Sequence, residues 1–145
     1  MKKLLLAIVA ISFSSFSLAQ TEQEGVEAAC MGYLEGFYEG DVAKLEASLK
    51  PTLNKFGFWR NKESGEFEHA GYMTFDEAKD YANNVLAKKN FAKPDAPKKV
   101  EVLDIGRTIA SAKVTAWWGT DYLLLSKTDG KWMIEQVIWE GPLEK

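Results

Sequence analysis

The stretch DYLLLSKTDGKWMIEQVIW, residues 121–139, predicts two antiparallel strands around a tight turn. Alternate residues of a strand point to opposite faces of its sheet. On the first strand Tyr122 and Leu124 therefore oppose Leu123 and Leu125. The same alternation divides the second strand into Trp132, Ile134 and Ile138 on one face and Met133, Val137 and Trp139 on the other. Both faces are apolar, and the flanking chain is too polar for a fully buried parallel sheet, so one face needs a separate cover.

Three helices are predicted ahead of this hairpin. Apolar residues recur at helical spacing over residues 22–39, and Gly40 ends that helix. A short second helix follows, which Pro51 stops. Thr74 begins a third helix with a capping-box signal, and the helical pattern ends near Lys88.

The other elements are strands. The turn signal at residues 61–65 predicts a hairpin between the second and third helices, and four antiparallel strands fill the last third of the chain. Residues 108–118 alternate small alanines with polar residues, which leaves space for a helix to cross that strand closely. Helices collected on one face of an antiparallel sheet make an α+β domain. We expect one such domain over residues 20–145.

The outer face of this sheet is the face for which no further element of the chain remains. The residues assigned to it are Leu123, Leu125, Met133, Val137 and Trp139. Burial of one large apolar side chain is worth about 1.5–3 kcal/mol, so exposing all of them would be costly. A second copy covering this face is the simplest arrangement, since twofold dimers are the commonest oligomers. A curled sheet whose ends shield these residues is the alternative.

The first 19 residues have the layout of a secretory signal peptide. Lys2 and Lys3 precede an apolar run, and small residues lead to Ala19, after which we expect cleavage. Serines interrupt the run well before the ~20 apolar residues that a membrane span requires. We therefore expect an exported protein, periplasmic or secreted, with no membrane association after cleavage.

The net charge of the chain limits the partners that it can bind. Its cysteine and histidine content limits the disulfides and metal sites that could stabilise it. The chain carries a net charge of −3, and loss of Lys2 and Lys3 with the signal peptide would leave −5. A chain with this net negative charge lacks the excess of basic residues that nucleic-acid binding requires. Cys30 is the only cysteine, so it forms no internal disulfide, and we expect a small buried hydrophobe. One histidine and one cysteine do not supply a zinc site, and we predict no metal and no cofactor.

The element order, with GYLEGFYEGDVAKLEASLKP at residues 32–51 and GTDYLLLSKTDGKWMIEQVIW at residues 119–139, resembles the nuclear transport factor 2-like superfamily. Within it the chain is most similar to the branch labelled "putative lumazine-binding" (SnoaL-like), over about residues 22–142. The resemblance implies a cone-shaped α+β barrel, in which a strongly curved mixed, mostly antiparallel sheet wraps three helices and often dimerises through its convex face. It implies no single function, because members include isomerases, cyclases, dehydratases and transport factors.

Such a cone has an open end, and the resemblance implies a pocket between the first helix, the hairpin and the inner face of the sheet. The side chains expected to line it are Tyr33, Phe37, Trp59, His69, Trp118 and Tyr122. Each ring taken singly also suits a plain core. Together they describe an apolar cavity with a few polar tips, which is the usual make-up of a small-molecule site.

His69 and Tyr33 are the candidate catalytic residues. His69 is the only histidine, and an unperturbed imidazole titrates near neutrality, so it can act as a general base on a carbonyl compound. Isomerases of this superfamily use carboxylates, and their acid positions do not match Glu66, Glu68 or Asp104 here. A surface histidine near the end of a hairpin is the alternative.

Three functions follow from these observations. The leading hypothesis is an exported, dimeric domain that binds a small apolar or aromatic molecule without transforming it. The first alternative is an acid/base enzyme, similar to an isomerase, cyclase or dehydratase, acting on a small carbonyl or cyclic substrate. The second is a protein-interaction module whose cone is filled by its own side chains.

Overall fold

The computed structural model describes residues 21–142, and the predicted signal peptide lies outside the described residues. The helices are α1 (Glu22–Glu39), α2 (Val42–Ser48) and α3 (Phe75–Lys88). The strands are β1 (Leu49–Arg60), β2 (Phe67–Met73), β3 (Lys99–Ile105), β4 (Ile109–Ala116), β5 (Gly119–Thr128) and β6 (Lys131–Glu140). No helix within residues 21–142 has the length and apolarity needed to cross a membrane.

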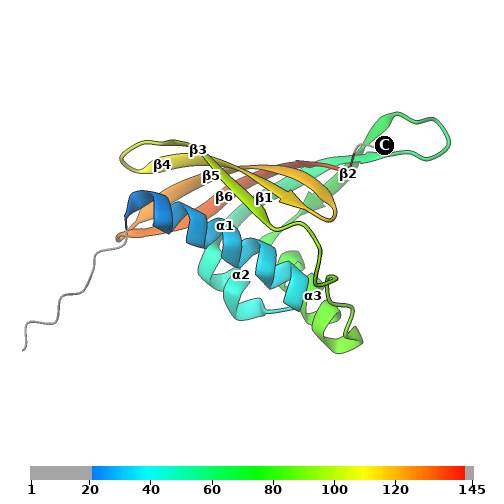
Figure 1. Ribbon diagram of the computed structural model, residues 1–145, viewed down its shortest axis with the longest axis horizontal. Coiled ribbons are helices and arrows are strands. Elements are labelled where there is room, and N and C mark those ends of the chain that lie inside the picture. The colour runs from blue at the N-terminus through cyan, green and yellow to red at the C-terminus, as the bar shows by residue number, and fades with distance from the viewer. Residues whose placement is uncertain (1–20, 143–145) are drawn as a thin grey trace, which may run out of the picture.

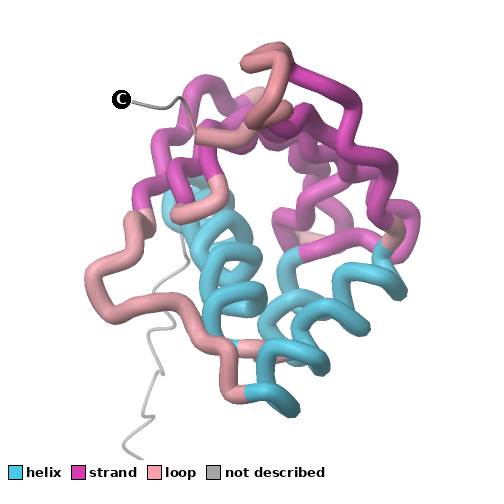
Figure 2. Tube along the Cα trace, turned by 90° about the vertical axis from the view of Figure 1, so that its right-hand side faces the viewer, coloured by secondary structure: helices cyan, strands magenta, loops and turns pink. Residues whose placement is uncertain are grey.

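All strands join one six-stranded sheet in the order β2-β1-β6-β5-β4-β3. The β1–β6 pair is parallel and the other pairs are antiparallel, so the sheet is mixed. Figure 1 shows the three helices on one side of this sheet. Figure 2, turned by 90°, shows the sheet arching over them. The predicted α+β cone with a curved, mostly antiparallel sheet is confirmed.

The helix ends agree with the local signals in the sequence, with one exception. Thr21 caps α1 in a capping box with Glu24, and Gly40 ends it in the left-handed conformation at φ 68°. Thr74 begins α3 with the predicted capping box. The exception is the end of α2, which stops at Ser48, so that Pro51 lies within β1 and not just behind a longer helix.

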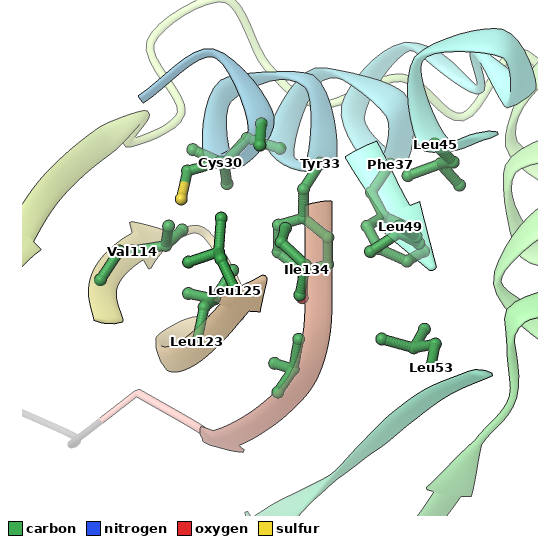
Figure 3. Close-up of a cluster of buried hydrophobic side chains, with 14 of the residues drawn as sticks. Cys30, Tyr33, Phe37, Leu45, Leu49, Leu53, Val114, Leu123, Leu125 and Ile134 are labelled. Carbon is green, nitrogen blue, oxygen red and sulfur yellow. The ribbon is translucent and has the colours of Figure 1, made fainter. Parts of the chain in front are cut away.

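The core forms where α1 crosses the inner face of the sheet. Ala110, Ala112 and Ala116 of β4 are buried on that face, and their small side chains leave the space that the helix requires. Figure 3 shows Cys30 and Tyr33 of α1 pointing toward the sheet. Cys30 is fully buried, as predicted.

The predicted division of the terminal hairpin into inner and outer residues is wrong for most of the outer set. Leu123, Leu125 and Val137 are almost completely buried in the core, and Figure 3 shows both leucines among the core side chains. Of the two others, Trp139 packs partly buried against the core, whereas Met133 is half-buried and is not part of it. Four of the five side chains assigned to a dimer interface therefore belong to the inner side of the sheet.

A β-bulge explains this error. Leu124 pairs with Gln136, but the next residue, Leu125, pairs with Ile134, so Glu135 is an extra residue in β6. One extra residue inverts the alternation beyond it, because side chains of a strand have a period of two. Trp132 and Ile134 before the bulge and Val137 after it consequently share the inner face.

The outer face remains apolar, but different residues form it. The exposed large hydrophobic residues of β3 to β6 are Leu103, Ile109, Tyr122, Leu124 and Ile138. A hollow of about 200 Å³ lies among Leu103, Tyr122, Leu124 and Ile138. The inference that this sheet has two apolar faces holds, and the set of residues on the outer face is corrected.

Replacing adjacent leucines of β5 tests the corrected faces. Leu125 is 2 % exposed and Leu124 is 52 % exposed. We expect Leu125→Ala to lower the free energy of unfolding by about 2–5 kcal/mol, because it opens a cavity in the core. In dilute protein, Leu124→Ala should change it by no more than ~0.5 kcal/mol. Urea unfolding measures both values, and equal losses would contradict the assignment.

Candidate ligand-binding site

A pocket of about 250 Å³ lies between α1, α3, the β1–β2 hairpin and the turn that joins β4 to β5. Aromatic residues form most of its lining, namely Phe37, Trp59, Tyr72, Tyr81, Trp117, Trp118 and Trp139. Met73 and the backbone near Gly71 complete it. Among the described residues that line the pocket, Lys55 is the one with a charged side chain.

The alternation of β1 carries Lys55 into the pocket. Leu53, Lys55 and Gly57 are buried on the inner face, and Trp59 continues the same row. Gly57 lies against Trp139 of the neighbouring strand, where a Cβ atom would meet the Trp139 carbonyl oxygen at 2.3 Å. Glycine at this position therefore allows the Trp139 ring to lie against β1 beside the pocket.

A buried hydrogen-bonded chain holds the Lys55 amine. Lys55 Nζ donates to the Tyr33 hydroxyl oxygen at 2.7 Å, and the Tyr33 hydroxyl donates to Asp121 Oδ2 at 2.5 Å. Trp118 Nε1 donates to the other carboxylate oxygen, Oδ1, at 2.8 Å. The chain joins β1, α1, β5 and the β4–β5 turn, because each of these elements supplies one member.

The surroundings of Lys55 disfavour its charge. Lys55 is 7 % exposed, and its Nζ lies 5.3–5.9 Å from the centroids of four aromatic rings. Burial lowers the pKa of Lys55, although Asp121 at 3.7 Å opposes part of that effect. Burial also raises the pKa of Tyr33, with the Asp121 charge adding to the increase, so Tyr33 is a neutral phenol.

Tyr38 of α1 positions the β4–β5 turn that carries two of the pocket tryptophans. Its hydroxyl donates to the Pro97 carbonyl oxygen and accepts a hydrogen bond of 2.9 Å from the Trp117 backbone N–H. The Tyr38 ring meets the Trp118 ring edge-on at 5.6 Å. A second hollow of about 460 Å³ lies between this turn and residues 90–97, and it shares Phe37, Tyr81, Trp117 and Trp118 with the first.

Half of the predicted pocket residues lie where the sequence placed them. Phe37, Trp59 and Trp118 line the pocket, and Tyr33 is fully buried below Lys55. The sequence reasoning missed Lys55 and Asp121. A signal for both was available: each is in phase with the inward-facing leucines of its own strand, which is an unusual place for a charge.

His69 and Tyr122 are wrong as pocket residues. The exposed His69 ring stacks on Phe56 at 5.8 Å, on the face of β1 opposite Lys55, and accepts a hydrogen bond from the Gly71 N–H at 3.0 Å. Two residues of β2, Ala70 and Gly71, lie opposite Gly57, so the hairpin alternation breaks next to His69. Tyr122 is 55 % exposed on the outer face of β5.

Other reactive groups are placed unfavourably for chemistry in this pocket. Burial raises the pKa of Cys30 to about 12, so its thiol is not ionised at neutral pH. Within residues 21–142, no three His, Cys, Asp or Glu residues are grouped closely enough to hold a metal ion. The chemistry available to the pocket therefore comes from Lys55, Tyr33 and Asp121.

The coupling between Lys55 and Asp121 can be measured from the free energies of unfolding of single and double variants. We expect Asp121→Asn to lower the free energy of unfolding by about 3–5 kcal/mol, because it leaves the Lys55 charge buried without a counterion. Adding Lys55→Met removes that charge, so the double variant should recover most of the loss. Urea unfolding at neutral pH of both single variants and of the double variant completes the cycle. Additive losses would show that the two residues are not coupled.

Comparisons with known proteins agree with this architecture. Residues 21–140 match the sequence model of the family described as "Putative lumazine-binding". An NTF2-like protein of unknown function from Shewanella baltica is similar in structure, with TM-score 0.63, 21 % identity and coverage of 85 % of this chain and 95 % of that one. An NTF2-like protein of unknown function from Silicibacter pomeroyi has TM-score 0.59 and 17 % identity, covering 82 % and 97 %.

A third similar structure, an NTF2-like protein from Cytophaga hutchinsonii, has TM-score 0.54 and 16 % identity, covering 83 % of this chain and 98 % of that one. The search of curated proteins found no match. At these identities the solved structures show the fold alone, whereas the family match spans most of the chain. The protein therefore belongs to the "Putative lumazine-binding" family, and it shares the fold of the NTF2-like proteins to which it is similar.

Proposed function

We propose that this protein is an exported domain that binds a small, flat, largely apolar or aromatic molecule in the pocket beside Lys55. The observation that carries the proposal is the composition of the pocket lining, in which aromatic residues predominate and Lys55 supplies one amine. A few polar groups in an apolar cavity are the usual arrangement of a small-molecule site. The family name is consistent with a flat ligand, but the proposal rests on the wall itself.

The size of the pocket limits the ligand. Sites for drug-sized molecules occupy about 300–1,000 Å³, and this pocket of about 250 Å³ suits one or two rings. Lys55 supplies the polar anchor. Its one hydrogen bond to a described residue goes to Tyr33, so further N–H groups remain for a carbonyl or carboxylate oxygen of the ligand.

The acid/base enzyme built on His69 has less support. General acid/base work requires the group to reach the substrate within hydrogen-bond distance. His69 packs outside the pocket, on the opposite face of β1 from Lys55. An interaction module with a filled cone is also less favoured, because the cone contains the aromatic pocket and the second hollow beside it.

Two exposed tyrosines provide a matched test of the pocket. Tyr81 is 41 % exposed and lines the pocket, whereas Tyr122 is 55 % exposed on the outer face. With 2-naphthoate as probe, we expect Tyr81→Ala to weaken binding about tenfold through the loss of one ring contact. Tyr122→Ala should leave the affinity unchanged. Titration calorimetry gives both dissociation constants.

The opposite result would contradict the proposal. If Tyr122→Ala weakened binding of the probe while Tyr81→Ala did not, the probe would be bound by the outer face. Absence of measurable heat with the wild-type protein, together with no rise in melting temperature at high probe concentration, would remove the small-molecule function.

We propose in addition that two copies associate through the corrected outer face. The exposed apolar side chains of Leu103, Tyr122, Leu124 and Ile138 surround one hollow on this face. Contiguous apolar residues of this kind usually mark an interface. A second copy suits this face because twofold dimers bury the same patch on both subunits.

Charge introduced into that face should separate the dimer. We expect Leu124→Glu combined with Ile138→Glu to give a monomer in sedimentation velocity, because carboxylates would face each other across the interface. Leu86→Glu is the control, since Leu86 is an exposed leucine of α3, away from the sheet face. A wild-type protein that sediments as a monomer at high concentration would disprove the dimer.

A further inference from the structure

We propose that Lys55 is a nucleophilic amine that condenses with the carbonyl group of an aldehyde or ketone ligand and holds it as an imine. The inference rests on the proposed function, because the carbonyl compound must enter the same pocket. It goes further by naming the chemical class of the ligand and by assigning a covalent bond to one atom, Lys55 Nζ.

The position of the amine supports this role. Lys55 lines the pocket and is almost completely buried there, so its amine is available to a ligand in the pocket and shielded from bulk water. Lys55 is 7 % exposed, and its amine is surrounded by aromatic rings, the Tyr33 hydroxyl and the Asp121 carboxylate. Desolvation in an apolar pocket is one of the ways in which proteins make a lysine nucleophilic.

The hydrogen-bonded chain provides a way to remove the amine proton without separating charge. A proton of the Lys55 ammonium passes to the Tyr33 oxygen while the Tyr33 hydroxyl proton passes to Asp121. The ion pair thereby becomes an amine, a phenol and a carboxylic acid, with no change in net charge. Burial lowers the pKa of Lys55 in this structure, which favours its neutral amine.

The condensation then balances with the groups already present. The nitrogen lone pair adds to the carbonyl carbon, and a proton moves from nitrogen to the former carbonyl oxygen, which gives a carbinolamine. The proton on Asp121 returns through Tyr33 to the hydroxyl group, which leaves as water. The products are one protonated imine and one water, with the Asp121 carboxylate as counterion, and nothing is oxidised or reduced.

Surface lysines do not have these features. An ordinary lysine has a pKa near 10.4, so only a very small fraction is neutral at pH 7. In Lys44, for example, hydrogen bonds to Glu35 and Glu39 raise the pKa above its ordinary value. We therefore expect carbonyl compounds to select Lys55 over exposed lysines such as Lys131.

Reductive trapping tests the proposal. The purified protein is mixed at neutral pH with 2-naphthaldehyde and sodium cyanoborohydride, whose hydride reduces the imine carbon to a stable secondary amine. Peptide mass spectrometry then locates the adducts. We expect Lys55 to be labelled at least about tenfold faster than the average exposed lysine, and 2-naphthoate to protect it by occupying the pocket.

Three variants separate the chemistry from folding. Lys55→Met should abolish the pocket adduct while the slow labelling of other lysines continues, and Lys131→Arg is the control that should leave Lys55 labelling unchanged. Tyr33→Phe should slow trapping by about tenfold or more, because the proton chain is broken. Raising the pH should restore trapping in Tyr33→Phe, because hydroxide then removes the ammonium proton, and this recovery distinguishes a role in proton transfer from a structural one. Circular dichroism confirms that each variant is folded.

The outcomes distinguish this inference from the proposed function. Labelling spread evenly over the lysines, with 2-naphthoate still bound in the pocket, would overturn the imine and leave the binding function intact. Failure of both trapping and 2-naphthoate binding would overturn both. Selective labelling of Lys55 that Tyr33→Phe does not slow would remove the proton chain from the mechanism and retain the imine.

Discussion

The buried Lys55–Tyr33–Asp121 chain is the interaction on which the site depends. A lysine taken out of water without a partner costs several kcal/mol, so Lys55 can face inward only where Asp121 and Tyr33 meet it. The three residues belong to β1, β5 and α1, and Trp118 attaches the β4–β5 turn to the same carboxylate. The distance between α1 and the sheet is thus fixed by hydrogen bonds at the point where the pocket begins.

The bulge at Glu135 also determines which residues form the site, because it changes the direction in which the side chains of β6 point. Without the extra residue, Val137 and Trp139 would point to the outer face, and Ile138 would point inward. With it, Trp139 reaches the pocket wall, and Ile138 joins Tyr122 on the outside. One inserted residue therefore decides the composition of both the pocket and the outer face, because strand alternation has a period of two.

The two faces of the sheet suit different tasks. The inner face combines a packed core with an aromatic cavity that contains one amine, and that combination favours a ligand with a carbonyl or carboxylate group. The outer face offers exposed apolar side chains and a hollow, which suits a second protein surface. Because this fold hosts many functions, the residues of the pocket carry the functional argument, and the architecture alone does not.

The sequence by itself determined the element order, the helix caps at Thr74 and Gly40, and the α+β class. These follow from local signals, namely periodicity, capping residues and turn residues, which act over a few neighbouring positions. The charged pair of Lys55 and Asp121 left a weaker trace, since each is in phase with buried leucines of its own strand. That Lys55 and Asp121 form a pair can be recognised only when the order of the strands in the sheet is known.

Only the tertiary structure decided the register beyond the bulge, the separation of His69 from the pocket, and the meeting of Lys55 with Asp121. The bulge at Glu135 is defined by pairing with β5, and no local signal in the strand marks it. Lys55 and Asp121 are 66 positions apart in the sequence, and they come together because β1 and β5 both flank β6. Contacts between residues so distant in sequence depend on strand order, which local propensity does not encode.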